Sequence, residues 1–142
     1  MADVADSVAA FLVANTGVNN LIAGRIHTDQ LPQGAIRPAI AFWKENTDHT
    51  QGVAGLAGAA ACRMAFECYA ATRSGANALA EAVKDALMPT DESFPIRGVI
   101  SGTHFLEVNL QQGQRYYAYA DGDGSDEHTY VTIQDFVFTY LE

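Results

Sequence analysis

The sequence is poor in basic residues. Its 142 residues include 8 Lys and Arg against 17 Asp and Glu, which gives a formal net charge of −9. The deficit is steepest at the end of the chain, because residues 121–142 contain six acids and no Lys or Arg. Proteins that read nucleic acid normally present a basic stripe, and an acidic surface repels phosphate. The composition therefore argues against specific nucleic-acid binding.

Long hydrophobic runs and a signal sequence are also missing. No apolar run reaches the roughly 18 residues of a membrane helix, and the acidic N-terminus lacks the basic segment of a signal peptide. The only cysteines, Cys62 and Cys68, fall in one predicted strand, about 20 Å apart and too distant for a disulfide. We expect a protein with no membrane association and free thiols, which suit the reducing cytoplasm in which it is made.

Residues 1–142 are expected to form one domain, because half of the chain is hydrophobic and a chain of this length can bury a core. Hydrophobic periodicity predicts that the domain is of the α+β class. Helical spacing covers residues 4–12 and the stretch after Ser74, taken as an N-cap. A short helical turn between them has Thr16 as N-cap and Gly24 as C-cap. The predicted strands cover residues 39–45, 62–70, 102–110, 115–120 and 129–141. The expected fold is an antiparallel sheet of about four to five strands with two main helices packed on one face, in the order α-β-β-α-β-β with or without one extra β segment.

Alternation assigns faces within these strands. Ile40 and Phe42 should point opposite to Trp43, and Leu106, Val108 and Leu110 should share a face. In the last strand both faces are apolar: Tyr130, Phe136, Phe138 and Tyr140 lie on one, and Val131, Ile133, Val137 and Leu141 on the other. Two helices can cover only one face, and a large exposed apolar patch usually marks an interface. We expect a second subunit to cover the other face, unless an additional β segment of the same chain does so. The predicted subunit-interface residues are Tyr130, Phe136, Phe138, Tyr140, Trp43 and Tyr69.

An acidic segment, D-G-D-G-S-D-E, separates the last two strands at residues 121–127. It suggests either a hairpin turn, since Asp-Gly pairs suit positive φ, or a calcium loop. As an EF-hand loop starting at Asp121, it has Asp126 where glycine is required and Thr132 where a bidentate glutamate is required. The turn is favoured, and a calcium-dependent binding module remains the alternative.

The remaining motifs do not assemble into an active site. The four histidines are scattered, and no zinc spacing or nucleophile elbow is present. The Gly-rich run from Gly52 to Gly58 lacks the following helix that a dinucleotide site needs. It lies in a predicted connection over residues 46–61, interpreted as an extended arm. We predict no catalytic residue, metal site or cofactor, and therefore not an enzyme.

The order of these elements resembles a family of small tailed-bacteriophage proteins, the tail completion or tail-to-head joining proteins. The resemblance is carried by a helix, the turn with Leu21, Ile22, Gly24, Arg25 and Ile26, a loop with Pro32, and the strand from Pro38 to Phe42. The second half is similar too, in its strand, its helix N-A-L-A-E-A-V-K-D-A-L and its closing strand with Asp135 and Phe136.

The resemblance implies a structural virion protein in the tail and neck, assembled in the host cytoplasm. Members are expected to form a homo-oligomeric ring, a hexamer, at the head-proximal end of the tail tube. The ring would terminate the tube and bind the tail tube protein and the head–tail connector or stopper, while DNA passes through without specific binding. Within this picture, Asp121, Asp123, Asp126 and Glu127 are candidates for the lumen of the ring, or else for a solvated outer turn. Gly52, Val53, Gly55, Leu56 and Gly58 are candidates for a docking arm.

Overall fold

The computed structural model describes residues 3–29, 36–49, 59–89, 98–110, 114–120 and 128–141. Its helices are α1 (Val4–Ala14), α2 (Thr16–Ile22) and α3 (Arg73–Leu87). Its strands are β1 (Ile26–His27), β2 (Ala39–His49), β3 (Ala59–Ala70), β4 (Gly98–Ile100), β5 (Thr103–Leu110), β6 (Arg115–Ala120) and β7 (His128–Leu141). None of these helices is long and apolar enough to cross a membrane.

The strands form one seven-stranded sheet in the order β1-β2-β3-β7-β5-β4, and β6 also pairs with β7. The α+β class is confirmed, but the predicted strand count and element order are not. A third helix is present, and β1 and β4 are additional strands of 2 and 3 residues. Strands this short carry too few residues to show alternation. The sheet is also not wholly antiparallel, because β1 pairs with β2 in parallel.

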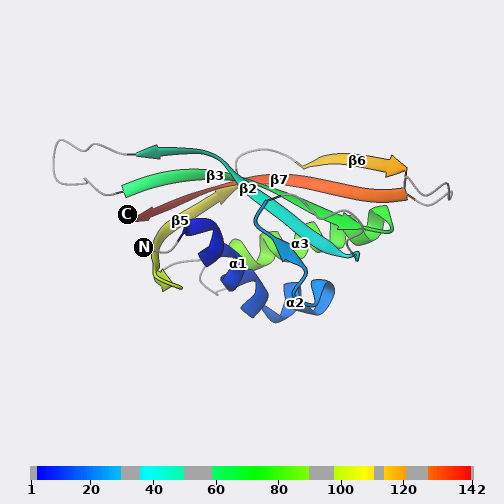
Figure 1. Cartoon of the computed structure of the whole chain (residues 1–142), viewed down its shortest axis with the longest axis horizontal. Helices are drawn as coiled ribbons and strands as arrows, with labels where there is room; N and C mark the ends of the chain where they lie inside the picture. The colour runs from blue at the N-terminus through cyan, green and yellow to red at the C-terminus, as the bar shows by residue number, and fades with distance from the viewer. Residues whose placement is uncertain are drawn as a thin grey trace.

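All three helices lie on one side of the sheet (Figure 1). The core forms between them and the inward face of β2, β3, β5 and β7. Phe42 of β2 stacks on Phe66 of β3 with ring centroids 4.7 Å apart, and Phe66 meets Phe136 of β7 edge to face. Such aromatic pairs add to the stabilisation that burial alone gives. As predicted, Ile40 and Phe42 point inward and Trp43 does not.

Buried polar groups fix α3 against β7. The Gln134 side chain, with no exposed surface, donates to the Ala80 carbonyl over 2.7 Å, and Thr132 Oγ1 donates to Asn77 Oδ1 over 2.7 Å. A buried polar group is costly unless it is hydrogen-bonded. These contacts therefore define how the helix sits on the sheet.

The helix caps differ from the prediction by one or two residues. Asn15, not Thr16, caps α2, and its side chain accepts a hydrogen bond from the Val18 amide over 3.1 Å. An N-cap residue keeps extended dihedrals, and Asn15 has them (φ −81°, ψ 119°), whereas Thr16 is already helical. Thr72 rather than Ser74 caps α3. The C-cap of α2 is Ala23 (φ 48°) rather than Gly24, which follows it and also has a positive φ of 80°.

Two strand predictions are also corrected. A bulge between Phe105 and Glu107 breaks the alternation of β5, so Phe105 and Val108 are buried and Leu106 is 38% exposed. The predicted 46–61 connection is shorter, because β2 continues to His49 and β3 begins at Ala59. Those β2 residues pair in register with β3, and a strand with one face in water tolerates the polar residues that suggested a loop.

Candidate functional site

One face of the sheet carries none of the described helices. Its side chains come from β2, β3, β6 and β7, and alternate with those of the core. They include Trp43, Arg63, Ala65, Glu67, Tyr69, Arg115, Tyr117, Ile133, Asp135 and Val137. We call this surface the helix-free face. It combines partly exposed apolar side chains with ion pairs.

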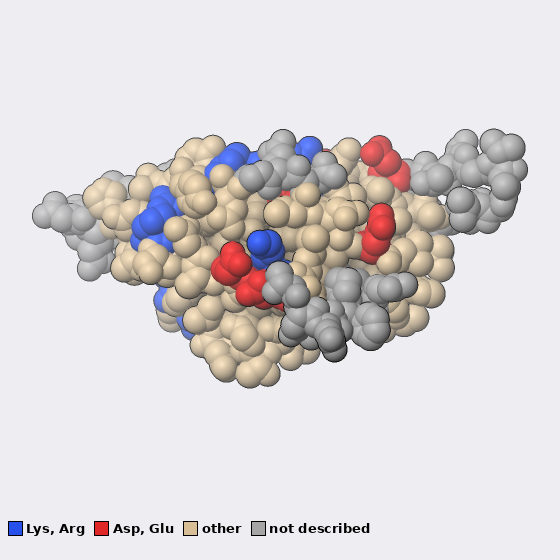
Figure 2. Space-filling view, turned by 180° about the vertical axis from the view of Figure 1, so that it is seen from behind, with Lys and Arg blue, Asp and Glu red and all other residues tan. Residues whose placement is uncertain are grey.

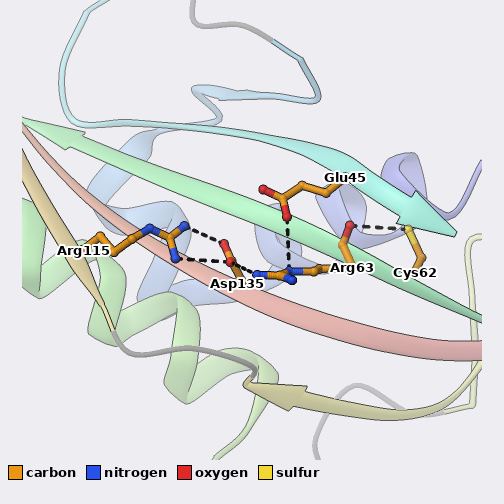
Figure 3. Close-up of polar contacts among 5 residues, drawn as sticks. All are labelled: Glu45, Cys62, Arg63, Arg115 and Asp135. Carbon is orange, nitrogen blue, oxygen red and sulfur yellow. Dashed lines mark hydrogen bonds and ion pairs between the residues drawn. The ribbon is translucent and has the colours of Figure 1, made fainter.

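The centre of the helix-free face is an ionic cluster on β7 (Figure 3). Asp135, 1% exposed, accepts from Arg63 Nη2 over 2.7 Å and from two nitrogens of Arg115 over 3.0 and 3.3 Å. Arg63 Nε also lies 3.2 Å from Glu45 Oε2, an ion-pair distance without hydrogen-bond geometry. Ala65 is the direct neighbour of Asp135 on β3, and its small side chain leaves space for the carboxylate.

The cluster holds the Asp135 carboxylate ionised. Burial raises the pKa of this group, but hydrogen bonds and charges from Arg115 and then Arg63 outweigh it, so the pKa is lowered overall. The pKa values of both arginines are raised, chiefly by their hydrogen bonds to Asp135. When Glu45 is included, the cluster contains two carboxylates and two guanidinium groups, so its net charge is zero. The cluster therefore ties β2, β3, β6 and β7 together and is a poor general base near neutral pH.

A shallow depression of about 280 Å³ lies beside the cluster, lined by Asn46, Asp48, Ala61, Arg63 and Val137. Small-molecule sites are mostly deeper, apolar clefts of about 300–1,000 Å³. Among the described residues, no group of three or more His, Cys, Asp or Glu side chains could hold a metal ion. The depression is thus a polar hollow in an otherwise open surface.

Comparison with known proteins identifies the family. The model of the family described as "Tail completion protein gp17" matches residues 6–118. The chain belongs to this tail completion family. The match includes Arg63 and Arg115 and stops before β7, which carries Asp135.

A solved structure shares the fold. A chain of the structure titled "Virion of native gene transfer agent (GTA) particle" is 16% identical, with a TM-score of 0.58. The alignment covers 96% of this chain and 93% of that one. No curated protein matches the chain. Membership of the tail completion family supports a structural role in a virion tail, and the solved structure shows that the same fold occurs in a gene transfer agent particle.

The predicted interface residues separate onto both sides of the sheet. Phe136 and Phe138 are fully buried against the helices, so they are not on a surface that a second copy could contact. This corrects the prediction for these two: both faces of β7 are apolar, and alternation alone cannot show which face the helices cover.

The other interface candidates are partly exposed. Tyr130 and Tyr140 lie on the helix side of β7, and the Arg73 guanidinium sits 5.3 Å from the Tyr130 ring. Trp43 and Tyr69 lie on the helix-free face. Their part in an interface stays a prediction.

The remaining candidates cannot be placed. The lumen residues Asp121, Asp123, Asp126 and Glu127 and the docking-arm residues Gly52, Val53, Gly55, Leu56 and Gly58 lie outside the described residues.

Sequence reasoning missed the ionic cluster. A signal was present, because Asp135 is a lone acid within an apolar strand, and charged residues are almost never fully buried unless paired. What the sequence did not show was the partner. Arg63 and Arg115 lie 72 and 20 residues away along the chain and meet Asp135 only through the strand order β3-β7-β6.

Figure 2 shows how the charged side chains are distributed over one face of the molecule. In this view from behind, the Lys and Arg side chains form separate patches, and acidic side chains lie next to one of them. No continuous basic surface is visible among the described residues.

Proposed function

We propose that copies of this chain close into a hexameric ring at the head-proximal end of the tail tube. The ring ends tube growth, contacts the tube protein on one side and contacts the head–tail connector or stopper on the other. Family membership supports the tail role, and the ring and its partners are our extension of it. DNA passes through the ring without specific binding, in keeping with the net charge of −9.

The observation that carries the proposal is the helix-free face. Three described helices cover one side of the sheet (Figure 1) and none covers the other. Trp43 and Tyr69 are only partly buried there, and aromatic residues are enriched at protein interfaces. A ring needs a contact between unlike patches that closes on itself. We place one of these patches on the helix-free face.

The two segments outside the described residues have secondary roles in the proposal. Acids of 121–127 line the lumen or its rim, where they avoid retarding the DNA. Residues 50–58 reach the tube or the connector. The calcium-module alternative depends on the same 121–127 segment and gains no support from the described part of the chain.

Electron microscopy of the purified chain, alone and mixed with isolated tail tubes, tests the proposal. We expect rings at one end of each tube, and tails that join to heads only when the chain is present. Trp43→Arg should abolish ring formation, while Leu21→Arg should not. Leu21 is a matched control because it is 38% exposed on α2, on the opposite side of the sheet. A monomer that persists both alone and with tubes or connector would refute the proposal.

A further inference from the structure

We draw no further inference here: the strongest candidate, the polar hollow beside the Asp135 cluster on the helix-free face, belongs to the surface already described as one side of the proposed ring contact, and nothing in the structure shows what covers it.

Discussion

Neutralising Asp135 should lower the stability of the fold at neutral pH. In Asp135→Asn the volume is kept, but one carboxylate oxygen becomes an NH₂ group that faces the donors of Arg63 or Arg115. Removing one partner from a buried ion pair costs about 3–5 kcal/mol when it strands a buried charge. Here the stranded arginine side chains are 32% and 35% exposed and regain hydration. We therefore expect a loss of about 2 kcal/mol, comparable to one charge-assisted hydrogen bond.

Thermal unfolding followed by circular dichroism measures this change. At roughly 3 °C per kcal/mol for a chain of this length, Tm should fall by about 6 °C. Asp48→Asn is the matched control on the same face. Asp48 is exposed, so its substitution should change stability by less than about 0.5 kcal/mol. Equal melting temperatures for Asp135→Asn and wild type at pH 7 would refute a stabilising role for the cluster.

The pH dependence gives a second check of the same reasoning. Folding lowers the pKa of Asp135 from its ordinary value near 3.8. Its contribution is therefore complete above that value and is lost as the pH falls through the lower folded-state pKa. The difference in Tm between wild type and Asp135→Asn should stay constant from about pH 7 to pH 5 and shrink below about pH 4. A difference that is unchanged at pH 3 would mean that the effect does not come from the carboxylate charge.

Two further predictions concern a packing contact and a cap. Arg73 donates to the backbone carbonyls of β6 and β7, so Arg73→Ala should speed amide hydrogen exchange in β6, where Lys84→Ala should not. Asn15→Ala removes the cap of α2 and should lower the free energy of unfolding, measured by urea titration, by about 1 kcal/mol. Thr16→Ala should leave it nearly unchanged.

Local patterns predicted most of the helices and strands. The alternation of β3 and the helical spacing of Leu79, Val83 and Leu87 placed the core side chains correctly, because burial selects apolar residues at the period of each element. The patterns failed where a single residue decides the geometry. The bulge near Leu106 and the cap at Asn15 depend on backbone dihedrals that neighbouring residue types do not fix.

The functional surface was predicted only in outline. That β7 is apolar on both faces was visible in the sequence, and so was the need for a second layer of cover. The sequence did not show which face of β7 the helices cover, since Phe138 and Val137 are equally plausible core residues when judged by hydrophobicity. The packing of α3 on β7, through Gln134, decides it.

The amino-acid sequence alone was enough to predict the α+β class, the buried free thiols, the acidic charge and the likeness to tail completion proteins. These follow from composition, periodicity and the order of elements, which are local properties of a chain. The contacts of Asp135 with Arg63 and Arg115, and the place of Phe136 and Phe138 in the core, became apparent only in the folded chain. Those features depend on strand order and register, because residues far apart in sequence interact only after the sheet has brought their strands together.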